Sequence, residues 1–136
     1  MEKYLFTKSI VGEKTPEDGK RISVMSRHTL EDGQTPDERI VEGESFDEWQ
    51  KDFAPPGKLV GAYYRKEIDW AEYERQYLEF LRSEEIRPKI EDFAKRCEEE
   101  TITLMCIEEI ADRCHRRLLA EELQKYRPNL KIVHRK

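Results

Sequence analysis

Two cysteines with seven residues between them, Cys106 and Cys114, are the residues of this sequence best suited to covalent chemistry. Cys106 follows an apolar stretch, and Cys114 is followed directly by His115 and Arg116. The thiolate is both a nucleophile and a metal ligand, and nearby cations or a helix start lower the pKa of a thiol. The pattern therefore indicates reactive sulfur at Cys106 or Cys114, and Glu108 between them is a candidate acid or base.

Three chemistries are open to these residues, beside the alternative that each cysteine is only a small buried side chain. Either thiol could be a nucleophile with His115 or His28 as its base. Cys106 and Cys114 could form a redox pair if their Cα atoms approach within about 6–7 Å. Zinc is the weakest alternative, because a fourth ligand is missing and adjacent helical side chains diverge by about 100°. We predict no metal and no cofactor.

Positive charge is concentrated at the start of the helix expected over residues 112–126. If Asp112 is the N-cap, Cys114 and His115 occupy the second and third helical positions. Each cation near this positive helix end costs about 0.3–1 kcal/mol. Either the three acids of residues 108–112 offset that cost, or a bound anion such as phosphate does. The cations are Arg113, His115, Arg116 and Arg117.

A second group of polar residues, Ser26, Arg27 and His28, follows the expected strand at 21–26. If that strand is parallel to the one ending at Cys106, both groups lie at the same sheet edge, where open α/β sheets bind ligands. Arg27 could then bind an anion with two hydrogen bonds, and His28 could titrate near neutral pH. The predicted anion-binding residues are Arg27, His28, His115 and Arg116.

The elements that must position these residues are those of an α/β protein. Residues 101–107, TITLMCI, are almost continuously apolar, which is typical of a strand buried on both faces. Residues 70–81 repeat apolar side chains at helical spacing. We predict one domain over residues 1–136, with three layers, a mostly parallel sheet of about four strands, and an acidic loop at about 27–45. The predicted strands are 4–10, 21–26, 101–107 and 130–134, and the predicted helices are 45–53, 69–85, 87–98 and 112–126.

Charge and hydropathy narrow the function class. The net charge is −5, and residues 31–52 hold nine acids and two bases, whereas the last twelve residues hold five bases and no acid. An acidic chain disfavours non-specific nucleic-acid binding. No apolar run approaches a membrane span, and the first residues lack the apolar centre of a signal peptide, so we expect a soluble, cytoplasmic protein. The alternatives to a small anionic ligand are an interaction module whose acidic loop docks a basic partner and a nucleic-acid-associated protein.

The segment around both cysteines resembles the domain-of-unknown-function 488 family. Its YeaO-like branch is also similar at Asp18-Gly19-Lys20-Arg21 and at Trp49 to Pro55, but that branch has Trp-Pro-Arg-Gly where this chain has Ser26-Arg27-His28-Thr29. The resemblance implies a compact α/β domain with a pocket at the Cys-His-Arg segment, and it implies no particular activity. The positions matching the family pattern are Leu104, Cys106, Glu108, Cys114, His115, Arg116 and Leu119.

Overall fold

The computed structural model describes residues 4–30, 32–107 and 114–135. In these residues it contains a five-stranded parallel sheet with strand order β3-β2-β4-β1-β5. The α/β class and the parallel sheet are therefore confirmed, with five strands in place of about four. The strands are β1 (Tyr4–Ser9), β2 (Lys20–Ser23), β3 (Glu48–Trp49), β4 (Ile102–Cys106) and β5 (Lys131–His134). The helices are α1 (Gly57–Tyr64), α2 (Trp70–Leu81), α3 (Arg87–Glu99) and α4 (His115–Tyr126), and the 3-10 turns are η1 (Pro16–Asp18) and η2 (Lys51–Phe53).

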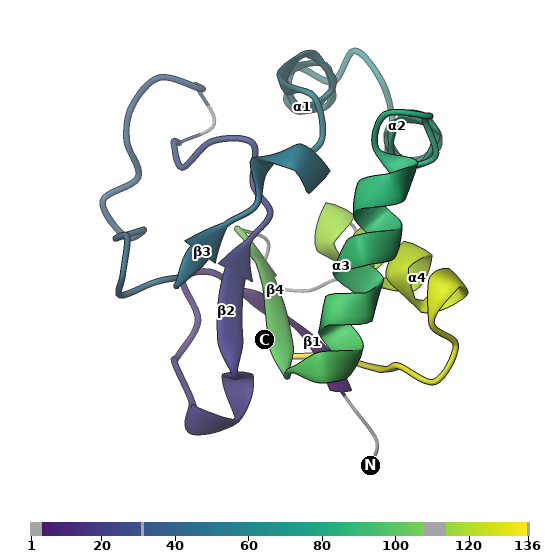
Figure 1. The fold of residues 1–136 in the computed structure, drawn as a ribbon. Helices are drawn as coiled ribbons and strands as arrows, with labels where there is room; N and C mark the ends of the chain where they lie inside the picture. The colour runs from purple at the N-terminus through teal and green to yellow at the C-terminus, as the bar shows by residue number, and fades with distance from the viewer. Residues whose placement is uncertain (1–3, 31, 108–113, 136) are drawn as a thin grey trace.

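The helices gather on one side of the sheet, as Figure 1 shows, so the described residues form two layers in place of the predicted three. The alternation of β1 and β4 turns Leu5, Ile102 and Leu104 toward them, and all three side chains are fully buried in the main apolar cluster. Burial of a leucine or isoleucine side chain contributes about 1.5–3 kcal/mol, so this cluster is the main source of stability. Asp69 is the N-cap of α2, and its carboxylate accepts a hydrogen bond from the Glu72 backbone N–H.

The opposite face of the sheet is held by ion pairs and by connecting segments. Lys8 and Asp18 form an ion pair at 3.2 Å with both side chains buried. Burial tends to raise the pKa of Asp18, but hydrogen bonds from Thr15 and Lys8 outweigh it, and the net pKa is lowered. The carboxylate is therefore charged at neutral pH and offsets the charge of Lys8.

The helix predicted at 45–53 is wrong. Glu48–Trp49 pairs with β2 as a parallel strand, and the 3-10 turn η2 follows it. The reason is tertiary, because the Asp47 carboxylate accepts hydrogen bonds from both the backbone N–H and the guanidinium of Arg21. Contacts with β2 therefore override the local tendency of this segment to form a helix.

Helix α1 was not predicted, and its sequence GKLVGAYY explains why. Two of its eight residues are glycines, each costing about 1 kcal/mol relative to alanine in a helix. Packing against α2, rather than propensity, accounts for the helix: Tyr63 lies 5.0 Å from Tyr73 and 5.8 Å from Trp70, measured between ring centroids. Helix α1 lies near the end of the sheet to which the arrows of β2 and β4 point in Figure 1.

No helix within the described ranges is long and apolar enough to cross a bilayer.

Candidate functional site

A cavity of about 600 Å³ lies at the carboxyl ends of the parallel strands. This volume is in the range of small-molecule sites. Five segments line it: the chain after β2, the helices α1 and α2, the end of β4, and the first residues of α4. The lining residues are Met25, Ser26, Arg27, Thr29, Leu30, Asp32, Asp37, Arg39, Val60, Tyr63, Tyr64, Trp70, Tyr73, Cys106, Ile107, Cys114 and His115.

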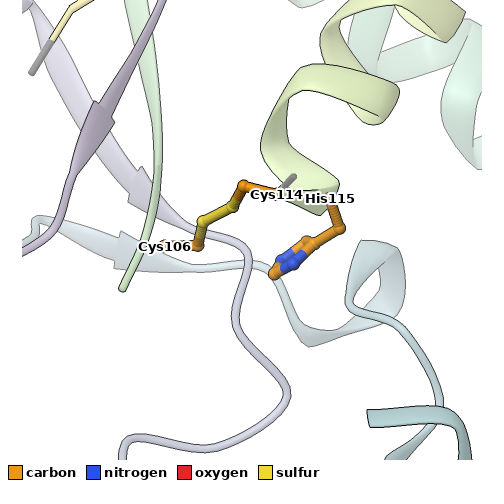
Figure 2. Close-up of side chains that lie close together, drawn as sticks. All are labelled: Cys106, Cys114 and His115. Carbon is orange, nitrogen blue, oxygen red and sulfur yellow. A yellow bond between two sulfur atoms is a disulfide. The ribbon is translucent and has the colours of Figure 1, made fainter. Parts of the chain in front are cut away.

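Cys106 and Cys114 meet at this cavity and are joined as a disulfide (Figure 2). Their Cα atoms are 7.5 Å apart, slightly beyond the range given above for a redox pair, yet the sulfurs are bonded. The disulfide ties the last residue of β4 to the residue before α4. The structure thus brings together the two predicted reactive cysteines and places both against the cavity.

Arg116 lies behind the disulfide and is fully buried. Its Nη1 atom is 3.3 Å from the Cys106 sulfur and 3.7 Å from the Cys114 sulfur, with hydrogen-bond geometry to both. An N–H donor carrying positive charge stabilises thiolate over thiol. Because Arg116 is not among the cavity-lining residues, its position suits the sulfurs rather than a ligand in the cavity.

The start of α4 differs from the prediction. Cys114, with extended backbone angles, is the N-cap, and His115 is the first helical residue. The predicted second and third helical positions for these residues are therefore wrong, and the predicted N-cap Asp112 lies outside the described residues. No side-chain hydrogen bond from Cys114 caps the helix, and its first turn contains no acid.

The His115 ring is fixed by two neighbours. Its Nε2 atom is 2.7 Å from the Val24 carbonyl oxygen, and the Tyr77 ring contacts it edge-on at 5.7 Å. Since a carbonyl only accepts, Nε2 carries the proton and Nδ1 the lone pair. Burial lowers the pKa of His115 to about 4, so the ring is neutral at pH 7.

The two arginines that line the cavity, Arg39 and Arg27, differ in whether a carboxylate binds them. Arg39 donates two hydrogen bonds to the Asp37 carboxylate, at 3.0 and 2.8 Å. Arg27 has no carboxylate within ion-pair distance among the described residues, and Asp32 contributes a coulombic interaction only. The Arg27 guanidinium lies so close over Gly33 that a Cβ there would be 2.8 Å from Arg27 Cζ. Arg27 is therefore the rim cation best placed to bind a ligand.

His28 lies outside the set of cavity-lining residues. Its Nε2 is 2.7 Å from the Ser23 hydroxyl oxygen, and its ring stacks on Trp49 at 3.8 Å. Burial, helped by the charge of Lys51, lowers the pKa of His28 to about 4. The prediction that His28 titrates near neutral pH is therefore wrong.

Two further residues of the predicted site, Glu108 and Arg117, are not among the described residues that line the cavity. Glu108, the candidate acid or base, lies outside the described residues, as do the other acids of residues 108–112. Arg117, one of the cations crowding the helix start, is bound by Glu74 at 3.2 Å and Glu121 at 3.2 Å. Part of the excess positive charge is thus offset by carboxylates of α2 and α4.

The aromatic wall of the cavity was missed as a functional element. Tyr73 and Tyr77, in the apolar stripe of α2, are buried in the core. The first two residues of the stripe, Trp70 and Tyr73, also line the cavity together with Tyr63 and Tyr64 of α1. The sequence feature that could have indicated this wall is the position of Trp70 in the first turn of its helix. At that end of the helix, the apolar stripe leaves the core and borders the cavity.

Comparisons with known proteins bear on the family alone. Neither a search of curated proteins nor a search of solved structures finds a match. The family model DUF488-N3a, described as the active DUF488-N3 subclade, matches residues 5–127. That range includes both cysteines, Arg27 and the aromatic wall, whereas membership of the YeaO-like branch stays a prediction. The chain belongs to the DUF488 family.

Proposed function

We propose that this protein binds a small molecule with an anionic group and a planar ring, such as a nucleotide, in the cavity at the carboxyl edge of the sheet. The observation that carries the proposal is the composition of one enclosed space. It joins a rim arginine, the positive end of a twelve-residue helix and a wall of four aromatic rings.

The anionic group is assigned to the end of the cavity formed by Arg27 and the start of α4. Cys114 and His115, the first residues of that end of the helix, both line the cavity. Backbone N–H groups at a helix start and the helix dipole favour negative charge, and a guanidinium can add two parallel hydrogen bonds. Asp37 lines the same cavity, but Arg39 occupies its carboxylate.

The planar ring is assigned to the aromatic wall. Tyr63, Trp70 and Tyr73 form a contiguous set, with ring centroids between 5.0 and 5.8 Å apart. Stacking of a base on an aromatic side chain contributes about 1–3 kcal/mol. This wall favours a nucleotide over a bare phosphate or a small carboxylic acid.

Reactive sulfur is the second part of the proposal. An external dithiol would break the S–S bond, supply two electrons and two protons and become a disulfide itself, which leaves Cys106 and Cys114 as free thiols. The Arg116 contacts support a thiolate, the nucleophilic form, at this place. Glu108 remains the proposed acid or base on sequence grounds.

The alternatives receive less support from the described contacts. Four acids of the 31–52 segment are bound within the protein, in the pairs Asp37–Arg39, Asp47–Arg21, Glu48–Arg96 and Asp52–Lys89. In the basic C-terminal segment, three cations are paired with Glu122, Glu98 and Asp18. Charges already neutralised within the chain contribute less to a partner surface.

A binding screen tests the proposal. Thermal shift and calorimetry would be run with inorganic phosphate, sulfate, adenosine and adenosine monophosphate. We expect the monophosphate to bind most tightly and to raise the melting temperature, because binding to the folded state stabilises it. Arg27→Gln should weaken that binding at least about 10-fold, since a charged hydrogen bond contributes about 1.5–3 kcal/mol.

The matched control is Arg65→Gln, which removes an exposed arginine paired with Glu67 and outside the cavity lining. It should leave binding unchanged. Equal affinity for the wild type and Arg27→Gln, or no binding of any of the four compounds, would contradict the proposal.

A further inference from the structure

We propose that Cys106, Cys114 and His115, once the disulfide is reduced, form a zinc site with one coordination position open to the cavity. This goes beyond the ligand proposed above and does not depend on it. Within the described ranges, this is the one cluster of three or more histidine, cysteine or acidic side chains whose donor atoms come close enough for a metal ion.

The three donor atoms lie close enough together to reach the spacing that zinc requires once the S–S bond is broken. One ligand atom from each residue lies within 4.8 Å of the other two. With Zn–S near 2.3 Å and Zn–N near 2.0–2.1 Å, the ligand atoms of a tetrahedral site are about 3.5–3.8 Å apart. An external dithiol breaks the S–S bond, supplying two electrons and two protons and becoming a disulfide itself. The two sulfurs can then separate, and zinc binding displaces the two thiol protons.

The backbone at Cys114 removes the objection that adjacent residues on a helix point apart. That objection holds for two helical residues, with side chains about 100° apart around the axis. Cys114 is instead the N-cap, with φ −138° and ψ 140°, and only His115 is helical. The change of backbone angle between the two residues lets the Cys114 sulfur and the His115 ring converge, whereas Figure 2 shows the Cys106 sulfur reaching them from the end of β4.

The surroundings of His115 are those of a metal ligand. Ligating histidines commonly donate their second ring N–H to a backbone carbonyl, which fixes the tautomer and ring orientation. Here the Nε2 proton goes to the Val24 oxygen at 2.7 Å, and the Nδ1 lone pair is left for the metal. Two thiolates and a neutral imidazole make the zinc site neutral overall. A neutral centre is compatible with the Arg116 guanidinium beside the sulfurs.

The open position follows from the count of ligands and from their location. Structural zinc sites have four protein ligands, whereas sites with three protein ligands keep a position for water or substrate. All three residues line the cavity, so the fourth position would face the space where a ligand lies. Zinc there would act as a Lewis acid on a bound oxygen atom.

The test uses the metal alone on the full chain. Protein reduced with a non-chelating reductant and treated with a chelator is titrated with Zn²⁺ and separately with Co²⁺. We expect one ion per chain, and the near-ultraviolet absorption of cobalt–thiolate bonds. Cys106→Ser, Cys114→Ser and His115→Gln should each weaken binding at least about 10-fold.

The control is Cys97→Ala, which removes a buried cysteine on α3 and should bind as the wild type does. His115→Gln keeps an N–H donor for Val24, so it carries the test if a cysteine variant fails to fold by circular dichroism. Failure of the reduced protein to bind either ion, or unchanged affinity in His115→Gln, would overturn the proposal. Because no nucleotide is present, neither result bears on the ligand proposed above.

Discussion

The three cysteines of this chain lie in two contrasting environments. Cys97 is fully buried in the main apolar cluster on α3, and burial raises the pKa of its thiol to about 12. Cys106 and Cys114 belong to a second, smaller cluster at the carboxyl edge of the sheet, beside the cavity and the Arg116 guanidinium. All three cysteines are buried, with 0%, 1% and 2% of Cys97, Cys106 and Cys114 exposed. The difference is that Cys106 and Cys114 border the cavity and contact the Arg116 guanidinium, whereas Cys97 has only the apolar core around it.

The same contrast separates the two parts of the molecule. Around Cys97, apolar side chains of α3, β1 and β4 fill the space, and substitution should cost stability. Around Cys106 and Cys114, a smaller apolar cluster borders the cavity, and substitution of the polar residues that line this cavity should cost binding. Each prediction below tests one consequence of this difference.

The largest expected effect is on alkylation rate. In the reduced, folded protein at pH 8, the raised pKa of Cys97 keeps its thiol protonated, whereas the Arg116 guanidinium beside Cys106 and Cys114 favours their thiolates. Iodoacetamide should therefore modify Cys106 and Cys114 at least about 100-fold faster than Cys97, as measured by peptide mass spectrometry. In urea all three should react alike. Modification of Cys97 at the rate of the other two in the folded protein would remove the contrast.

The next effect is on the free energy of unfolding. Ile90→Ala, in the fully buried cluster that holds Cys97, should lower it by about 2–5 kcal/mol because a core cavity is left. Leu30→Ala, at a cavity-lining residue that is 46% exposed, should change it by less than about 0.5 kcal/mol. Urea denaturation measures both. Equal losses would show that the carboxyl edge is packed like the core.

A smaller effect concerns pH. His28 and His115 have pKa values of about 4 in the folded protein, against 6.5 when unfolded. The contribution of the two neutral histidines to the free energy of unfolding is complete above pH 6.5. It is lost as the pH falls toward 4, because the unfolded chain then binds more protons than the folded protein. Lowering the pH from 7.5 to 5.5 should reduce the free energy of unfolding by about 1 kcal/mol for each histidine. In urea denaturation at both pH values, His115→Gln should lose less free energy of unfolding on acidification than the wild type. An equal loss in the two proteins would contradict the lowered pKa of His115.

The last effect is on nucleotide binding and is expected at Gly33. A Cβ there meets the Arg27 guanidinium, and the positive φ of 74° adds backbone strain. Gly33→Ala should displace Arg27 and weaken nucleotide binding about 3–10-fold, with a loss of stability near 1 kcal/mol. Gly43→Ala is the matched control, since its φ is also positive but nothing lies within 4 Å of an added Cβ. If calorimetry shows that both variants weaken nucleotide binding equally, Arg27 does not belong to the binding site.

The features predicted from sequence are those that a short stretch of residues determines. The apolar run ending at Cys106 is the buried strand β4, and the stripes of α2, α3 and α4 lie on the core. The burial of these elements follows the local periodicity of apolar residues, so the sequence pattern alone was sufficient to predict them. The pairing of Cys106 with Cys114 was one of several alternatives that the sequence left open, and the structure joins the two sulfurs.

The features that were not predicted depend on contacts between distant residues. The segment at 45–53 is a strand and a 3-10 turn because Asp47 binds Arg21, which lies 26 residues earlier in the chain. The aromatic wall required α1, which packing on α2 stabilises despite its two glycines. His28 was placed at the correct sheet edge, but its stacking on Trp49 turned it away from the cavity. Nothing in the local sequence indicates which ring it contacts.

The two tryptophans give the most direct test of the central claim, that a small ligand binds at the carboxyl edge of the sheet. Trp70 lines the cavity, whereas the Trp49 indole N–H donates to the Met25 carbonyl oxygen at 2.7 Å and is not part of the lining. In a nitrogen-15 NMR titration with adenosine monophosphate, the indole signal of Trp70 and the backbone amide of His115 should shift together and saturate, while the Trp49 signal stays in place. Absence of any shift, or shifts confined to residues 125–135, would contradict the account.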